Sequence, residues 1–255
     1  MNVNQLVGIP TGINQGLTSA RQSTMLSLLG NPRSDYDQSC REVTNPVLKP
    51  LIGTRDLVKF RARGLIPALD LLELVVADIK VQRPEVYNAL GTAGMLCVRN
   101  QRGSTTAISN HSWGTAIDLT LNGQLDVRGD RKVQRGLTEI YEIFNHHGWY
   151  WGAAFGVEDG MHFEVSEQLI RKWASNGTLS GTKQKPPKPL LTLGDRGPEV
   201  QRLQQALNIV TGSNLVADGV FGAGTFAAVA AFQGSKGLSP DGAVGAKTWA
   251  ALGLD

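Results

Sequence analysis

The chain has 255 residues, of which 41% are hydrophobic and 18% are charged, and its formal net charge is +3. This length suits one large or two modest globular domains with a sizeable core. The small positive excess is compatible with an anionic polymer as partner but is too weak for the charge pattern of a nucleic-acid-binding protein. The N-terminus has no basic start or long apolar run typical of a signal peptide or a membrane span. We therefore expect no membrane insertion, and either a cytoplasmic protein or one exported by other means.

Local patterns before residue 100 predict packing elements rather than a functional site. The expected elements are an amphipathic helix over residues 19–29, a strand around 57–62, a buried helix over 66–79, a short helix over 85–90 and a strand over 95–98. Cys40 and Cys97 lie far apart in the sequence and form no metal or redox motif. A disulfide and two free thiols are both compatible with this spacing.

A short segment in the middle of the chain contains two candidate metal ligands, His111 and Asp118. Alternation over residues 115–121 predicts a strand with Ile117 on the core face and Asp118 on the opposite face. Gly114, between the two ligands, allows a sharp turn or a close approach of the backbone to another segment.

A second segment supplies a third candidate ligand. Alternation over residues 161–165 places His162 and Glu164 on the polar face of another strand. If this strand pairs near the first, His162 joins His111 and Asp118. Two imidazoles and one carboxylate, with a fourth position open, are the ligands of a catalytic zinc site. We therefore predict one bound Zn²⁺, although these ligands do not exclude other metals.

Between and after these segments, further elements are predicted. They are a hairpin at Asn122-Gly123 with residues 124–127 as its return strand, a helix over 130–147 and a short helix over 166–173. His146 and His147 close the longer helix, where cationic side chains favour the helix dipole. Adjacent positions near a helix end do not both face one metal, so we do not predict these histidines as ligands.

Two spaced motifs carry a family resemblance. Ser-x-His-x-x-Gly-x-Ala-x-Asp at residues 109–118, followed by Asp-x-x-His at 159–162, resembles the zinc D,D-carboxypeptidase and L-alanyl-D-glutamate peptidase family of peptidoglycan hydrolases. The resemblance covers roughly residues 95–165. It implies an α+β fold, with a small antiparallel sheet flanked by helices, and hydrolysis of a peptide bond in the bacterial cell wall.

The resemblance also implies roles for individual residues. His111, Asp118 and His162 become the metal ligands, and Asp159 becomes the general base. Asp159 lies three residues before a ligand, where its carboxylate could take a proton from water and pass it to the leaving amine. Glu158 is the competing acid, and we prefer Asp159 because the family's acidic residue has this spacing.

Arg99, Ser109 and Trp151 are predicted to contact the substrate. By resemblance, Arg99 binds a substrate carboxylate or the developing oxyanion, although Cys-Val-Arg departs from the family's more usual Gly-Tyr-Arg. Arg102 is also available for this role. Ser109 is a candidate contact by the same resemblance, and the aromatic run around Trp151 is expected to form part of the core and part of the cleft wall.

The C-terminal part of the chain has a different composition. Residues 176–189 are rich in proline and lysine and are predicted to be a linker. In residues 190–255 the pattern Asp-Gly-x-x-Gly-x-x-Thr-aromatic-Ala-Ala-apolar occurs twice, from Asp218 and from Asp241. Each copy predicts a turn leading into a helix, with Thr225 and Thr248 near the helix starts. This part resembles a peptidoglycan-binding domain of three short helices and contains no catalytic pattern.

Together these observations predict an α+β peptidase domain over residues 1–175, a linker over 176–189 and a wall-binding domain over 190–255. The expected function is that of a monomeric zinc peptidase with bacterial peptidoglycan as partner, similar to a phage endolysin. Both L-alanyl-D-glutamate endopeptidase and D-alanyl-D-alanine carboxypeptidase activity remain open. A non-catalytic wall-binding or virion protein and a dipeptidase acting on soluble substrates are the alternatives.

Overall fold

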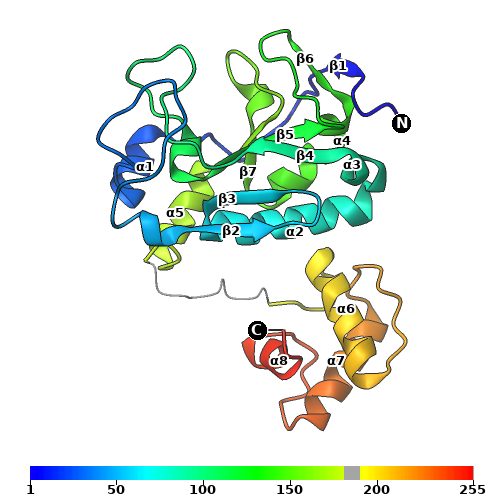
Figure 1. The fold of residues 1–255 in the computed structure, drawn as a ribbon. Helices are drawn as coiled ribbons and strands as arrows, with labels where there is room; N and C mark the ends of the chain where they lie inside the picture. The colour runs from blue at the N-terminus through cyan, green and yellow to red at the C-terminus, as the bar shows by residue number, and fades with distance from the viewer. Residues whose placement is uncertain (181–189, 255) are drawn as a thin grey trace. The chain divides into compact units, whose positions relative to one another are not determined.

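The computed structural model describes residues 1–180 and 190–254 (Figure 1). The chain divides into two compact units, Met1–Lys183 and Gln184–Asp255. Most of the predicted linker, residues 181–189, lies outside the described residues. No helix in the described part of the chain combines the length and the apolar composition needed to cross a membrane.

The first unit is built around an antiparallel four-stranded sheet in the order β4-β5-β8-β7. Its strands are β4 (Leu90–Gly94), β5 (Ala116–Leu121), β8 (His162–Val165) and β7 (Trp149–Trp151). The helices of the unit are α1 (Gln22–Leu29), α2 (Ile66–Gln82), α3 (Pro84–Ala89), α4 (Arg135–His146) and α5 (Glu167–Ser175). Two small antiparallel pairs join β1 (Leu6–Gly8) to β6 (Lys132–Gln134) and β2 (Ile52–Asp56) to β3 (Arg61–Leu65). The predicted α+β class is confirmed.

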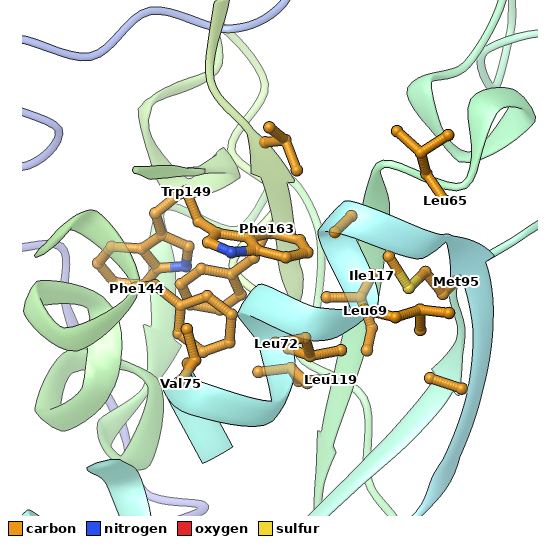
Figure 2. Packing of buried hydrophobic residues seen from close by; sticks show 14 of the residues in the cluster. Leu65, Leu69, Leu72, Val75, Met95, Ile117, Leu119, Phe144, Trp149 and Phe163 are labelled. Carbon is orange, nitrogen blue, oxygen red and sulfur yellow. The ribbon is translucent and has the colours of Figure 1, made fainter. Parts of the chain in front are cut away.

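One face of the sheet forms the core of the first unit. Figure 2 shows Leu69 and Leu72 of α2 lying against Ile117 and Leu119 of β5, and all four side chains are fully buried. Each such burial stabilises the fold by roughly 1.5–3 kcal/mol. Because neighbouring side chains on a strand point to opposite faces, this packing turns Asp118 away from the core.

Several predicted elements differ from the structure. Residues 57–60 form the turn between β2 and β3, where the Leu57 amide donates to the Phe60 carbonyl, so the strand predicted at 57–62 is wrong for most of its length. Residues 95–98 form no strand, because their amides donate to carbonyls of three different segments, at Arg63, His111 and Arg41. Of the predicted return strand, only Gln124 pairs with β5, in an isolated bridge to Leu121.

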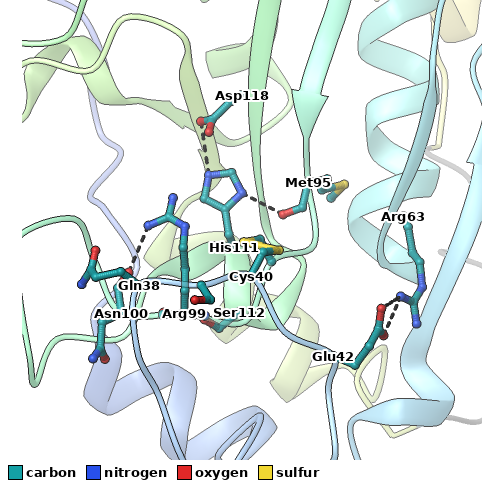
Figure 3. Close-up of a disulfide and its surroundings, with 12 residues drawn as sticks. Gln38, Cys40, Glu42, Arg63, Met95, Arg99, Asn100, His111, Ser112 and Asp118 are labelled. Atoms are coloured by element: carbon teal, nitrogen blue, oxygen red, sulfur yellow. Dashed lines mark hydrogen bonds and ion pairs between the residues drawn. A yellow bond between two sulfur atoms is a disulfide. The ribbon is translucent and has the colours of Figure 1, made fainter.

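Cys40 and Cys97 form a disulfide, with a Cα–Cα distance of 4.9 Å (Figure 3). It joins the long loop after α1 to the segment that follows β4. The same segment contains Met95 and Arg99, so the disulfide ties that loop to one wall of the site described below. The alternative of two free thiols is thereby excluded.

The second unit contains α6 (Pro198–Thr211), α7 (Ala223–Ser235) and α8 (Ala246–Ala251). Two buried glutamines hold its turns with matching hydrogen bonds. The side-chain amide of Gln204 donates to Asp218, Val220 and Thr225, and that of Gln233 donates to Asp241, Ala243 and Thr248. The two carbonyl oxygens accept from the amides of Gly219 and Gly242. The repeated sequence pattern therefore encodes two copies of one turn built around a glutamine.

Candidate metal centre

Three segments bring the predicted ligands together on the polar face of the sheet. Asp118 and His162 are directly opposite each other in the pairing of β5 with β8. His111 lies in a short 3-10 helix, Asn110–Trp113, that precedes β5. Among the described residues, these three form the only group of histidine, cysteine and acidic side chains with metal-ligand spacing.

The donor atoms of the three ligands form a nearly equilateral triangle. His111 Nε2 is 3.2 Å from both Asp118 Oδ1 and His162 Nδ1, and His162 Nδ1 is 3.1 Å from Asp118 Oδ1. Ligand distances of about 2.0 Å in a tetrahedral zinc site place neighbouring donors about 3.3 Å apart. The triangle therefore fits three corners of a zinc tetrahedron, and all three ligands line a cavity.

Hydrogen bonds on the far sides of the two rings select the nitrogen that faces the centre. His111 Nδ1 lies 2.7 Å from the Met95 carbonyl, which can only accept, so this nitrogen carries the proton (Figure 3). In the neutral ring, His111 Nε2 then keeps its lone pair for a metal. His162 Nε2 lies 2.9 Å from the Glu164 carboxylate, which in the same way leaves Nδ1 of a neutral ring as the ligand atom.

Glu164 is buried and fully engaged in hydrogen bonds. Besides His162, it accepts from the Ser19 hydroxyl at 2.6 Å, the Asn110 side-chain amide at 2.9 Å and the Ala20 backbone amide at 3.2 Å. Burial alone would raise the pKa of Glu164, but the hydrogen bonds from His162, Ser19 and Asn110 lower it below its ordinary value. A buried anion is therefore held against the outer nitrogen of His162.

The site is strongly polarised in the metal-free protein. Burial opposes a charge on Asp118, yet the neighbouring His111 and His162 hold its pKa well below the ordinary value. Burial likewise opposes a charge on His162, but its hydrogen bonds with Asp118 and Glu164 outweigh this effect and raise its pKa to about 10. These hydrogen bonds therefore favour a protonated His162 when no cation is bound.

Gly114 is required by the turn between His111 and β5. Its φ of 66° lies in the left-handed region, and a Cβ there would be 2.7 Å from both the Gly64 Cα and the Leu65 amide nitrogen. The predicted sharp turn and the predicted close approach therefore both occur at this residue. Together they set the position of His111 relative to β5.

A cavity of roughly 380 Å³ opens at the metal site and contains the candidate base. Asp159 lines this cavity, whereas Glu158 is buried outside it and accepts a hydrogen bond from the Arg131 amide at 2.7 Å. Burial raises the pKa of Asp159, and His162 partly offsets this effect. The geometry therefore favours Asp159 over Glu158 as the acid that faces a substrate.

The predicted substrate contacts separate into two groups. Arg99, Arg102 and Ser109 line the cavity. The half-buried Arg99 donates to the Asn100 carbonyl at 3.0 Å, and burial followed by repulsion from Arg102 lowers its pKa. Trp151, in contrast, is fully buried, and its indole donates to the Gly160 carbonyl at 2.7 Å. The prediction that Trp151 contacts substrate is therefore corrected: it packs in the core and anchors the segment that carries Asp159.

Sequence reasoning missed two residues of the site. Glu164 alternates with His162 on the polar face, and this pairing was the available signal for its role beside the ligand. Arg128 lines the cavity from the loop after β5 and has no recognisable motif around it. His147, which was not predicted as a ligand, pairs instead with the buried Asp78 at 2.7 Å.

The fold and the site define an α+β protein with a candidate metal centre and a separate helical module. Residues 102–165 match the family described as D-alanyl-D-alanine carboxypeptidase, and residues 196–252 match the putative peptidoglycan binding domain. The first unit is therefore similar, over residues 102–165, to the D-alanyl-D-alanine carboxypeptidase family, and the second unit is similar, over residues 196–252, to a peptidoglycan-binding domain.

Individual proteins are similar to shorter parts of the chain. An uncharacterized protein in the bpoA1 3'region of Kitasatospora aureofaciens is 46% identical over 66 residues, which are 26% of this chain and 56% of that protein. The chain thus spans about half the length of the curated relative it matches. A Burkholderia AP3 phage endolysin is 47% identical over 25% of this chain and 24% of its own, with a TM-score of 0.24. The SleB N-terminal domain is 39% identical over 25% of this chain and 88% of its own, with a TM-score of 0.25.

Proposed function

We propose that the protein is a zinc-dependent peptidoglycan peptidase. The observation that carries this proposal is the triangle of donor atoms from His111, Asp118 and His162, with edges of 3.1–3.2 Å, at the floor of an open cavity. The family match over residues 102–165 supports a peptidase, and the match over 196–252 supports peptidoglycan as its partner.

The residues around the triangle suit peptide hydrolysis. When bound, zinc would supply Lewis-acid activation of a peptide carbonyl and of water. Asp159 would accept the proton of the attacking water and pass it to the leaving amine. Arg99 and Ser109, which also line the cavity, would orient the substrate, and the Arg99 guanidinium can stabilise a developing negative charge.

The two units support an enzyme tethered to its polymer. We propose a peptidase domain over residues 1–175, a linker over 176–189 and a wall-binding domain over 190–255. Binding of the second domain to the wall would raise the local concentration of stem peptides at the first. A protein of this kind would act on the cell wall as a monomer, as an endolysin does.

The cleaved bond is proposed to lie in the stem peptide, with L-alanyl-D-glutamate ahead of D-alanyl-D-alanine. Cutting between alanine and glutamate severs the mesh, whereas removal of a terminal D-alanine does not. For an enzyme that lyses the cell wall, we therefore favour cleavage of the L-alanyl-D-glutamate bond.

Digestion of purified peptidoglycan tests this proposal. Wild type, Asp159→Asn and the neighbouring control Glu158→Gln are compared, with released ends identified by mass spectrometry and zinc content measured on each protein. We expect new peptide ends from wild type and Glu158→Gln, and none from Asp159→Asn despite bound zinc. If wild type binds the wall and holds zinc without releasing ends, a non-catalytic wall-binding protein is the correct description. If it cuts only soluble peptides, the dipeptidase alternative holds.

A further inference from the structure

Arg128 is a cavity residue whose donors are largely unused. Its side chain is 43% exposed, and its Nε lies 3.5 Å from Asp159 Oδ2. Within residues 1–180 and 190–254, this loose ion pair is the only polar contact of the guanidinium. Arg99 and Arg102, in contrast, each donate a hydrogen bond to a backbone carbonyl. Arg128 is therefore the arginine of the cavity with the most free donors for a ligand.

The loop that carries Arg128 is fastened to the loop that carries Asp159. Glu158 accepts from the Gly129 amide through its carbonyl at 3.2 Å and from the Arg131 amide through its carboxylate at 2.7 Å. From the other loop, the buried Asp126 packs against Gly160 and accepts from the Gln134 amide at 2.8 Å. These contacts on both sides of Arg128 hold its backbone close to the loop that carries Asp159.

The charge of the cavity favours an anionic ligand. Three arginines line it, and they are matched in number by the carboxylates Asp118, Asp159 and Glu164. A divalent ion at the metal centre would therefore leave two positive charges in excess. An excess of this sign, concentrated in a cavity, attracts anions.

The position of Arg128 indicates which part of the substrate it meets. A general base must return its proton to the leaving amine, so the residue that carries this amine lies next to Asp159. Arg128 also lies next to Asp159, with its Nε 3.5 Å from Asp159 Oδ2. In both candidate bonds, the residue after the cut carries a free carboxylate. We propose that Arg128 binds this carboxylate and thereby selects substrates that carry a negative charge directly after the scissile bond.

This inference rests on the proposed function and is tested with paired peptides. L-Alanyl-D-glutamyl and D-alanyl-D-alanine peptides are each prepared with the carboxylate after the scissile bond free or converted to the amide. Wild type, Arg128→Ala, Arg128→Lys and the control Lys132→Ala are assayed for kcat and KM, and peptide binding is measured by calorimetry on the same zinc-loaded proteins. Lys132 is an exposed cation near Arg128 that does not line the cavity, so its removal controls for net charge.

We expect Arg128→Ala to lower kcat/KM for the cleaved carboxylate peptide by a factor about 10- to 100-fold larger than for the amide peptide, mainly through KM. Arg128→Lys retains part of the preference, and Lys132→Ala retains all of it. An equal loss on both peptides overturns the inference, because Arg128 would then only orient Asp159. If wild type binds the carboxylate peptide through Arg128 without cutting it, the proposed function fails and the inference stands. If it binds neither form, both fail.

Discussion

Replacement of Glu164 by glutamine tests how much the metal centre depends on its buried support. Glu164 Oε1 accepts from Ser19 and Ala20, and Oε2 accepts from Asn110 and His162. A glutamine has only one acceptor oxygen, so its NH₂ group must face donors in either orientation. If that group faces His162, the ring must move its proton to Nδ1, which is the atom that would bind zinc.

The expected cost is a 10- to 100-fold loss of zinc affinity, which is typical for removal of a carboxylate behind a ligating histidine. This range corresponds to about 1.4–2.7 kcal/mol. The unmet donors should also lower the free energy of unfolding of the metal-free protein by about 1–3 kcal/mol. Zinc affinity is measured by competition with a chromophoric chelator, and stability by urea unfolding of the metal-free protein.

Glu167→Gln is the matched control for this experiment. Glu167 is also a buried carboxylate with several donors, from Arg21, Thr24 and Arg171, but it contacts no ligand. We expect this variant to lose stability and to keep the zinc affinity of wild type. An unchanged zinc affinity in Glu164→Gln, or an equal loss in both variants, would refute the argument that Glu164 acts on the metal through His162.

Three further outcomes are expected. Because the pKa of His162 without a bound metal is raised to about 10, zinc binding at pH 7 should release about one proton, and the apparent zinc affinity should rise with pH up to about pH 10. Calorimetry in two buffers of different ionisation enthalpy measures the number of protons released. If no proton is released, the assigned protonation of His162 is wrong. Gly114→Ala should destabilise the protein by about 1–3 kcal/mol or more, because the left-handed φ and the contact with Gly64 both oppose a Cβ. An unchanged midpoint of thermal unfolding would refute the close approach of the Gly114 backbone to Gly64. Gln204→Ala and Gln233→Ala should each lower the stability of the second unit by a similar amount, about 2–4 kcal/mol, because each leaves the matching groups of one turn without hydrogen-bond partners. Hydrogen exchange of the α6 and α7 amides measures this loss. A large effect from only one of the two variants would show that the two turns are not equivalent.

Alternation in the sequence was sufficient to predict the two faces of β5 and β8. Apolar Ile117 and Leu119 had to face the core, so Asp118 faced the other way, and the same reasoning applied to His162. The predicted helices at 66–79 and 85–90 are also confirmed, since their dense apolar residues pack in the core. The spacing of apolar residues therefore predicted the secondary structure correctly in those segments where one face is buried in the core.

The parts that sequence reasoning missed depend on contacts between distant segments. The Met95 carbonyl reaches His111 because residues 95–98 leave the sheet and bond to three other segments, and no local pattern encodes that path. The loop that carries Arg128 is held at the cavity by hydrogen bonds from the Gly129 and Arg131 amides to Glu158, a distant residue that no local sequence pattern links to this loop. Trp151 was misplaced because an aromatic near a site can line the cleft or the core, and only the packing with Tyr141 and Phe163 distinguishes the two.

The pairing of Asp118 with His162 has a consequence for folding as well as for chemistry. A shift of β8 by one residue along β5 would send His162 to the opposite face, away from Asp118. An ion that requires both residues would therefore bind only the correctly registered sheet and would stabilise it in proportion to the logarithm of the metal concentration. Zinc binding would then favour the correct register of β8 along β5. Its removal should speed amide hydrogen exchange in the centre of the sheet before any helix unfolds.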